Sequence, residues 1–302
     1  EVAKEIKIAD FVVCRMPSDL GCLAASYCIK NNIPYSIEMV GEVFGAYCDG
    51  GSFARKLYAS IAEWKTKRII KKAKGMLYVS EKLSQLYKAP ADVEKVIATN
   101  AVIHSVSTVA DIEVRCKRLL SKGYIPKIGL IGSYFVDYKG IDIAIHALAA
   151  LADKGRPLAL HILGGGDSKR YIELAEKLGV ASLLNFDGVL PAGEPVRSWL
   201  LDCDYYIQPS RQEGLPRGLL EAMSTGLPAV GSSVGAIPDL LKPDYIHRKG
   251  DFLDLTNKII NMLDADYEEL SKESLRIAES YRFDLVNSRR KNFYKKVFQL
   301  AK

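Results

Sequence analysis

Short apolar runs alternate with helical repeats along the second part of the chain. Apolar runs that predict buried strands lie at 128–131, 158–163, 184–186, 205–208 and 229–232, with a less distinct run at 245–247. Between these runs, apolar residues recur at helical spacing over 141–153, 169–178, 195–202, 216–224 and 236–241. Alternation of this kind with short loops predicts a parallel sheet that helices cover on both faces.

The first part of the chain repeats this pattern over fewer strands. The predicted strands lie at 10–14, 34–40, 75–80 and 95–99. Breaks at Gly123 and Pro126 predict a domain boundary. We therefore expect an N-terminal domain over residues 1–126, a second domain over 127–283 and a C-terminal helix over 284–302.

A strongly basic helix is predicted over 52–74. Leu57, Ile61, Trp64 and the pair at 69–70 recur on it at roughly helical spacing. Its basic side chains are Arg55, Lys56, Lys65, Lys67, Arg68, Lys71, Lys72 and Lys74. Two interpretations stay open. Either the helix packs its apolar face on the sheet, or residues 55–74 attract an anionic membrane surface, to which each Lys or Arg contributes on the order of 1 kcal/mol.

Composition narrows the class of protein. The chain has 302 residues, 48% of them hydrophobic and 26% charged, which is enough to bury two cores. No apolar run approaches the roughly 18 to 20 residues that span a bilayer, and the charged N-terminus does not resemble a signal peptide. The net charge of +6 comes without a helix-turn-helix, zinc or aromatic-platform pattern, so nucleic acid is not expected as a partner.

The six cysteines form no CxxC motif and no Cys/His cluster. We expect them to be reduced, mostly buried thiols of a cytoplasmic protein, and a disulfide among the first four is the minor alternative.

One stretch, residues 208–241 (QPSRQEGLPRGLLEAMSTGLPAVGSSVGAIPDLL), concentrates the candidate chemistry. It predicts a Pro-Ser turn after a strand, a glycine-containing loop and a helix that begins at about Pro216. The free N–H groups of a first helical turn favour an anion. Glu213 precedes this helix and Glu221 projects from its second turn, so one extended ligand could touch both carboxylates.

These residues resemble the signature of the retaining glycosyltransferases of family 4 (group 1). The resemblance rests on the PS turn, on Glu213 and Glu221 eight positions apart, on the intervening GLP and on the following EAM-x-x-G-x-P. It implies an α/β protein of the GT-B fold, with two Rossmann-like parallel-sheet domains that face a cleft and a last helix that crosses back to the first domain. The N-terminal domain is expected to be incomplete or small, because the family's first strand and glycine-rich turn have no counterpart here.

The resemblance assigns donor-binding roles in the second domain. Glu213 would hold sugar hydroxyls and stabilise an oxocarbenium-like transition state, and Glu221 would bind the ribose hydroxyls. Lys139 and the helix mouth would hold the diphosphate, so neither a metal nor another cofactor is expected. Ser133 stands where the family usually has an arginine. The remaining donor-binding candidates are Gly132, Gly164, Gly165, Gly188, Val189, Gly214, Leu215 and Pro216.

The expected reaction moves a sugar from a UDP- or GDP-linked donor to a glycan or lipid-linked acceptor in surface polysaccharide synthesis. The resemblance and the basic helix place it in the cytoplasm, peripherally on the inner face of the membrane. Arg15 and Glu42, at the ends of the first two strands, are acceptor-side candidates that can equally be strand-end surface residues. The alternative is a non-catalytic or incomplete nucleotide-sugar-binding fragment, and a GT-B isomerase or phosphorylase fits the motif less well.

Overall fold

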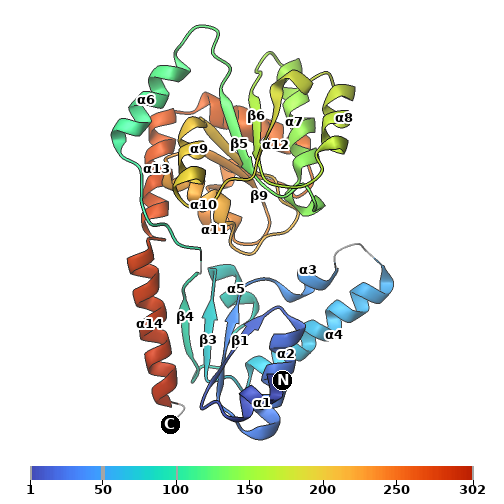
Figure 1. Ribbon diagram of the computed structural model, residues 1–302, viewed down its shortest axis with the longest axis vertical. Coiled ribbons are helices and arrows are strands. Elements are labelled where there is room, and N and C mark those ends of the chain that lie inside the picture. Colours follow the sequence, from blue (N-terminus) through green and yellow to red (C-terminus); the bar gives the residue numbers. More distant parts are fainter. Residues whose placement is uncertain (1, 49–51, 100, 301–302) are drawn as a thin grey trace. The chain divides into compact units, whose positions relative to one another are not determined.

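The computed structural model describes residues 2–48, 52–99 and 101–300 (Figure 1). It divides the chain into two compact units: unit 1, residues 1–100 with 283–302, and unit 2, residues 101–282. Each unit is built on its own parallel sheet.

Unit 1 contains, among the described residues, a four-stranded parallel sheet of order β1-β2-β3-β4. The strands are β1 (Val12–Met16), β2 (Tyr35–Met39), β3 (Gly75–Tyr78) and β4 (Glu94–Ile97). The register places Cys14 opposite Ile37 and Ile37 opposite Met76. The helices are α1 (Val2–Lys7), α2 (Asp19–Asn31), α3 (Val43–Cys48), α4 (Phe53–Ile70), α5 (Glu81–Leu86) and α14 (Phe283–Leu300).

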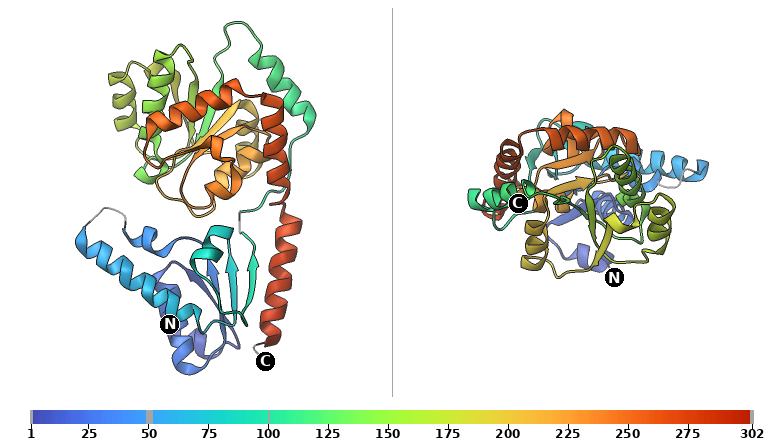
Figure 2. Two further views of the ribbon diagram at one scale, coloured as in Figure 1. Left: turned by 180° about the vertical axis from the view of Figure 1, so that it is seen from behind. Right: turned by 90° about the horizontal axis from the view of Figure 1, so that it is seen from above.

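The last helix, α14, packs on the sheet of unit 1 and runs beside β4 (Figures 1 and 2). Gly75 of β3 makes room for it, since a Cβ at this position would lie 2.6 Å from Cγ2 of Val297. The rings of Phe11 and Phe298 meet edge to face with 4.8 Å between their centroids. Residues 301–302 of the expected C-terminal helix lie outside the described residues.

Unit 2 contains, in its described residues, a six-stranded parallel sheet of order β10-β9-β8-β5-β6-β7. The strands are β5 (Lys127–Ile131), β6 (Ala159–Leu163), β7 (Leu184–Gly188), β8 (Tyr205–Gln208), β9 (Ala229–Ser232) and β10 (Ile246–His247). The helices are α6 (Val109–Leu119), α7 (Ile141–Asp153), α8 (Lys169–Lys177), α9 (Glu194–Asp202), α10 (Arg217–Ser224), α11 (Ile237–Leu240), α12 (Phe252–Asp264) and α13 (Tyr267–Glu279). Short 3₁₀ helices lie at η1 (Asp137–Lys139), η2 (Ala181–Leu183) and η3 (Pro243–Tyr245).

Two separate cores cover the faces of this sheet. Alternate residues of β8 point to opposite sides, so Tyr205 and Ile207 join the core beneath α7 and α12, while Tyr206 joins the core formed with α10. The predicted parallel sheet with helices on both faces is therefore confirmed.

The domain boundary predicted at residue 126 is wrong, because the segment that precedes β5 belongs to unit 2. The buried carboxylate of Asp204, just before β8, is the main anchor. It accepts hydrogen bonds from Arg118 Nε (2.9 Å), from the Tyr124 hydroxyl (2.7 Å) and from the Lys127 N–H (2.8 Å). The break in the helical pattern at Gly123 and Pro126 follows the end of α6 and lies within unit 2. The boundary between the units lies near residue 100.

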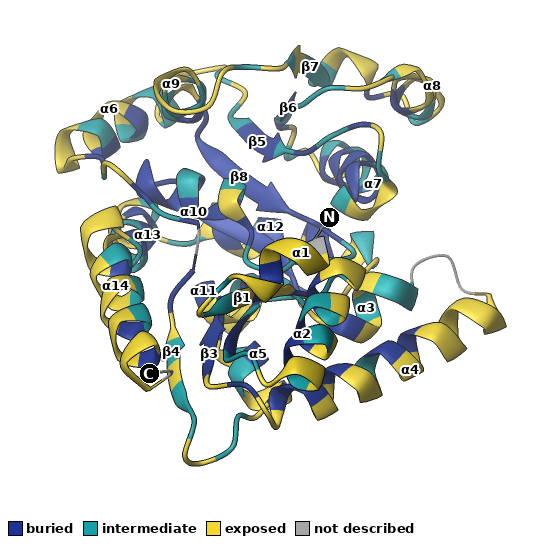
Figure 3. Ribbon diagram, turned by 60° about the horizontal axis from the view of Figure 1, so that its bottom comes forward, coloured by how far each residue is buried: buried dark blue, intermediate teal, exposed yellow. Residues whose placement is uncertain are grey.

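The expected packing of the basic helix is also wrong in part. α4 buries Ala59, Ala62 and Thr66 together with the pair at 69–70, whereas Leu57, Ile61 and Trp64 are exposed. Figure 3 shows most of α4 in the colour of exposed residues. The side that contacts the rest of unit 1 is therefore mainly the side with small residues.

Two further expectations concern the membrane and the thiols. No helix among the described residues is long and apolar enough to cross a membrane. All six cysteines are free, and Cys14, Cys28 and Cys203 are buried.

The buried anchor gives the first prediction. Replacing Asp204 with Ala leaves the Arg118 guanidinium without its buried partner, and breaking such a pair costs about 3 kcal/mol of the free energy of unfolding. The measurement is urea unfolding in a Trp64→Phe background. There the remaining tryptophan, Trp199 of α9, reports on unit 2.

The matched control is Asp264→Ala, which removes an exposed partner of Arg156 (side chains 57% and 39% exposed). This change should cost less than about 1 kcal/mol, because solvent screens an exposed pair. An equally small loss for Asp204→Ala would contradict the anchoring role.

Candidate functional site

The carboxyl ends of the central strands of unit 2 carry the predicted site. The chain runs from β5 outward through β6 to β7 and then returns to place β8 on the other side of β5, so the strand order reverses between β5 and β8. Ligands of open parallel sheets bind at such a switch point. Three of the predicted donor-binding residues, Gly132, Gly164 and Glu213, lie in the loops that follow β5, β6 and β8, and these strands are adjacent in the sheet.

Backbone hydrogen bonds join the loops after β5, β6 and β7. The Gly132 N–H donates to Leu163 O (3.0 Å), the Gly164 N–H to Gly188 O (2.7 Å) and the Tyr134 N–H to Gly165 O (2.8 Å). A Cβ at Gly164 would lie 2.0 Å from Gly132 O, so a side chain there would separate these loops.

Glu213 lies at the centre of the site. Its side chain is 9% exposed. Its Oε1 accepts hydrogen bonds from Lys139 Nζ (2.8 Å), from the Ser210 hydroxyl (2.8 Å) and from Gln208 Nε2 (3.1 Å). Within the part of the chain that the structure describes, these donors all reach one oxygen, so Oε2 faces none of them.

The Gln208 amide is itself held in place by Tyr206. The buried Tyr206 hydroxyl donates to Gln208 Oε1 (2.9 Å) and accepts from the N–H of Ile131 (3.3 Å). Burial raises the pKa of Tyr206, so the phenol stays protonated and remains a donor. Because the amide oxygen faces Tyr206, the amide N–H groups face Ser210 and Glu213.

Lys139 reaches Glu213 from the opposite half of the sheet. It ends η1, after β5, and Gly140 follows it at a φ of +70°. A Cβ at Gly140 would lie 2.2 Å from Pro209 O, so only glycine lets the loops after β5 and β8 come this close. The structure therefore brings two of the predicted residues, Lys139 and Glu213, into one ion pair.

A second ion pair, which the sequence analysis missed, clamps the same two loops. The Arg211 guanidinium donates to Asp142 Oδ1 (2.8 Å) and Oδ2 (2.6 Å), and the Arg211 N–H donates to Tyr138 O (2.6 Å). Burial alone would raise the pKa of Asp142, but the hydrogen bonds and charge of Arg211 outweigh it and lower that pKa below its ordinary value. An acid in a first helical turn is common, so sequence gave no distinct signal for this pair.

Ser133, which occupies the family's usual arginine position, points its hydroxyl at Gly165 O (3.2 Å). A different arginine, Arg170 in the first turn of α8, lies near the same loop, where it pairs with Asp137 and donates to the Tyr171 hydroxyl (2.5 Å). Arg170 is not among the residues predicted from the sequence, because its approach to the loop after β5 depends on the pairing of β5 with β6.

Glu221 is separate from this network in the described residues. It projects from α10 and accepts a hydrogen bond from Arg217 Nε of the same helix at 2.8 Å. The Glu221 side chain is 24% exposed and that of Arg217 is 63% exposed.

Pro216 is the N-cap residue of α10 rather than its first helical residue, so the expected helix start is one position too early. The loop before it is fixed by Gly214 O, which accepts from the Ala236 N–H (2.8 Å).

The remaining donor-side candidates lie at the edges of the site. Val189 is 73% exposed, and a Cβ on Gly165 would lie 2.9 Å from its Cγ2, so these two residues are close neighbours. Leu215 is partly buried against the core near α10.

The acceptor-side candidates lie in unit 1. Arg15 and Glu42 are both exposed, Arg15 near the end of β1 and Glu42 after β2. The neighbouring carboxylate of Glu38 accepts hydrogen bonds from Arg290 and Tyr294, so it serves to attach α14 to the sheet.

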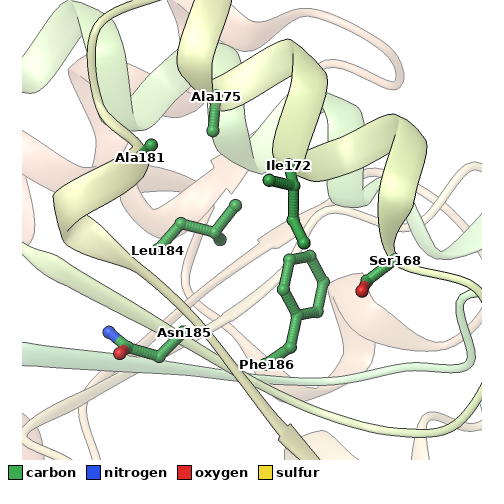
Figure 4. A pocket seen from close by; sticks show the side chains of 7 residues that line it. All are labelled: Ser168, Ile172, Ala175, Ala181, Leu184, Asn185 and Phe186. Atoms are coloured by element: carbon green, nitrogen blue, oxygen red, sulfur yellow. The ribbon is translucent and has the colours of Figure 1, made fainter.

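A shallow pocket of about 350 Å³ lies elsewhere in unit 2, between α8 and β7. Figure 4 shows the side chains that line it, mostly apolar ones such as Ile172, Leu184 and Phe186. No charged side chain lines it, so it lacks the cations that a diphosphate needs.

The Arg211–Asp142 clamp gives the second prediction. A double-mutant cycle with Asp142→Ala and Arg211→Ala should give a coupling free energy of about 1 kcal/mol at neutral pH, because the pair is bidentate but over a third exposed on each side. Since the pKa of Asp142 is lowered in the folded state, this stability is present above the ordinary aspartate pKa of about 4 and is lost as the pH falls through the lowered value. Urea unfolding at several pH values measures both.

The control cycle uses Lys169 and Glu173, a pair 3.9 Å apart with side chains 79% and 62% exposed. Its coupling should stay below about 0.5 kcal/mol. If the coupling free energy of Arg211 and Asp142 equals that of the control pair, or does not change with pH, Arg211 does not hold the loops together.

The sequence is similar to those of known glycosyltransferases, mainly over unit 2, which carries the candidate site. The family model described as "Glycosyl transferases group 1" matches residues 125–265, which are most of unit 2. CapJ of Staphylococcus aureus is 35% identical over 307 residues, which span 98% of this chain and 76% of CapJ. The putative colanic acid biosynthesis glycosyltransferase WcaL of Escherichia coli K12 is 29% identical over 48% of this chain and 38% of its own length.

Solved structures show the same fold at low sequence identity. Sucrose-phosphate synthase from Thermosynechococcus elongatus superposes with a TM-score of 0.73 at 15% identity, over 96% of this chain and 74% of that one. HepE of Anabaena, crystallised with UDP, superposes with a TM-score of 0.73 at 16% identity, over 98% and 82%. The predicted fold class, two parallel-sheet α/β domains of the GT-B type, is thereby confirmed. The chain belongs to the group 1 glycosyltransferases.

Proposed function

We propose that the protein is a retaining glycosyltransferase of family 4 that moves a sugar from a UDP- or GDP-linked donor to a glycan or lipid-linked acceptor in surface polysaccharide synthesis. The observation that carries the proposal is the nearly buried Glu213 carboxylate, held by Lys139, Gln208 and Ser210 at the switch point of unit 2. Named relatives support the pathway class: WcaL for colanic acid and AmsK of Erwinia amylovora for amylovoran. HepE structures with UDP and UDP-glucose support the donor class.

The diphosphate would bind where Lys139 and the first turn of α10 meet. The N–H groups of that turn point out of the helix end, and the helix dipole adds to the charge of Lys139. This field needs no metal ion, so we propose metal-independent transfer. Lys139 Nζ pairs with Glu213 at 2.8 Å. A diphosphate, which carries a higher negative charge than the carboxylate, would compete for this ammonium group.

Glu213 keeps its position when Lys139 turns to the diphosphate. Ser210 and Gln208 still donate to Oε1, while Oε2 is left for a sugar hydroxyl. The fixed negative charge would stabilise positive charge that develops at the anomeric carbon. The bond from this carbon to the diphosphate oxygen breaks, the acceptor oxygen attacks from the same face, and the acceptor proton passes to the leaving diphosphate.

Glu221 would bind the ribose. Its only described side-chain partner is the largely exposed Arg217, and an exposed pair of this kind is weak enough for ribose hydroxyls to replace it. Gly188 and Val189 would contact the base, and Arg15 and Glu42 remain acceptor-side proposals. We also propose a cytoplasmic reaction, which suits six free thiols.

The second candidate is a nucleotide-sugar-binding chain without turnover. The observation in its favour is Ser133, since its hydroxyl is engaged with Gly165 O and supplies no cation to a diphosphate. Measurements of nucleotide binding and of sugar transfer separate the two candidates, because both candidates bind the nucleotide and only the transferase moves the sugar.

Glu221→Ala should weaken binding of whichever nucleoside diphosphate, UDP or GDP, binds the wild-type chain, as measured by calorimetric titration. Hydrogen bonds to a charged group contribute about 1.5–3 kcal/mol, so we expect a loss of tenfold or more. The wild type should discriminate against the 2′-deoxy nucleotide, and the variant should not. Arg217→Ala removes the pair but keeps the carboxylate, so this control should retain the discrimination. Equal discrimination in wild type and Glu221→Ala would exclude the ribose role.

Lys139→Met and Glu213→Gln should have opposite effects on binding. Lys139→Met should weaken binding of the nucleoside diphosphate but not of the nucleoside. Glu213→Gln should bind the diphosphate at least as well as wild type, because the competing ion pair is gone. It should nevertheless lose about 10²–10³-fold in sugar transfer or donor hydrolysis, the usual cost of removing a group that stabilises developing charge.

The activity of each variant on UDP- and GDP-linked sugars is measured by detecting the nucleoside diphosphate that is released. If Glu213→Gln lost binding to the same extent as Lys139→Met, the carboxylate would be a donor-binding group only. The non-catalytic candidate would be correct if the wild type bound the nucleotide but formed no more of it from the nucleotide-sugar than Glu213→Gln does.

A further inference from the structure

The outward face of α4 in unit 1 is unusual for a helix at the surface of a protein. An amphipathic helix ordinarily buries its large apolar residues and exposes its polar ones. In α4 the buried face is made of Ala59, Ala62 and Thr66 together with the isoleucine pair at 69–70, whereas four other large apolar residues face outward.

Four large apolar side chains form a single exposed stripe on α4. Phe53 is 83% exposed, Leu57 53%, Ile61 42% and Trp64 56%. Their spacing of four, four and three residues places them along one side of a helix with 3.6 residues per turn. That side lies opposite the buried alanines, and each of the four side chains is at least 42% exposed.

Basic side chains border the stripe on both sides. At 100° per residue, Lys56 and Lys67 project on one side of it and Lys65 on the other. The guanidinium of Arg68 lies 4.7 Å from the centre of the Trp64 ring, at the end of the stripe.

The charge of this segment exceeds that of the whole chain. Residues 52–74 carry eight Lys and Arg residues and one acid, Glu63, so their net charge is +7, whereas the whole chain carries +6. Glu63 is 17% exposed, pairs with Lys67 at 2.9 Å and accepts a hydrogen bond from the Tyr87 hydroxyl (2.7 Å). It therefore offsets the charge of Lys67 but not the charges of Lys56, Lys65 and Arg68.

We propose that this face of α4 docks unit 1 onto an anionic lipid bilayer. The stripe would enter the boundary between headgroups and acyl chains, and the flanking ammonium and guanidinium groups would meet lipid phosphates. The two features suit a bilayer surface together, because indole rings lie at the level of the headgroups and cations meet anionic lipids there. The surface lies in unit 1 and does not depend on the proposed chemistry of unit 2.

The test is co-sedimentation of the whole chain with vesicles, without any donor. We expect binding to vesicles of equal parts phosphatidylcholine and phosphatidylglycerol, and little binding to phosphatidylcholine alone. Raising the salt concentration should weaken the binding, since salt screens exposed charges. Leu57→Ser/Trp64→Ser should lower the affinity roughly tenfold or more, because it removes half of the apolar stripe.

The matched control is Val114→Ser/Leu120→Ser, which changes two apolar residues of unit 2 that are more exposed (64% and 86%) than Leu57 and Trp64, and it should bind as wild type does. A second readout needs only the wild-type chain and Trp64→Phe. Brominated lipids should quench the wild-type fluorescence and leave that of Trp64→Phe unchanged, because Trp199 lies outside the docking face.

Three results would overturn the proposal. The first is equal binding to both kinds of vesicle. The second is unchanged vesicle binding by Leu57→Ser/Trp64→Ser. The third is a mass in solution that rises with concentration for wild type but not for this variant, without vesicle binding, which would mean that a second copy of the chain covers the stripe.

Discussion

The ion pair between Lys139 and Glu213 is the interaction on which the site of unit 2 depends. It joins a residue that follows β5 to a residue that follows β8, across the line where the strand order of the sheet reverses. A carboxylate that is 9% exposed is costly to bury without a cation and hydrogen-bond donors. Lys139, Ser210 and Gln208 supply them, and the Arg211–Asp142 pair holds the same two loops together a few residues away. Glycine at position 140 permits this approach, because any Cβ there would collide with Pro209 O.

The rest of unit 2 keeps these loops in place. Each face of the sheet has its own core, so strands β5 and β8 are fixed from both sides. Asp204 then attaches the segment before β5 to the start of β8, at the opposite end of the strands from Glu213. Buried tyrosine at position 206 connects strand packing to site geometry, since its hydroxyl orients the amide of Gln208. Rigidity of this kind is what electrostatic stabilisation of a transition state requires.

Much of the fold was predictable from the sequence, because strand-forming runs and helical repeats alternate clearly in unit 2. The individual residues of the candidate site were predictable, since the resemblance to the family's motif pointed to Glu213 and Lys139. Their contact was not predictable, because it depends on the order of strands in the sheet. Arg211 and Asp142 gave no signal for the same reason. The prediction of how α4 packs was wrong in part for a different physical reason. Periodicity shows that apolar residues share a face, but it does not show whether Ala59 and Ala62 or Leu57 and Trp64 meet the neighbouring elements.

The two units thus present different chemistry: unit 2 a carboxylate and cations around a switch point, and unit 1 an exposed apolar and basic helix face. We propose that the Lys139–Glu213 pair marks the diphosphate site, and a crystal structure with bound UDP or GDP is the measurement that decides this. We expect Lys139 Nζ to leave Glu213 for the diphosphate, Ser210 and Gln208 to keep their hydrogen bonds to the carboxylate, and the first turn of α10 to face the phosphates. A nucleotide bound elsewhere, for instance between α8 and β7, with the ion pair intact, would contradict it.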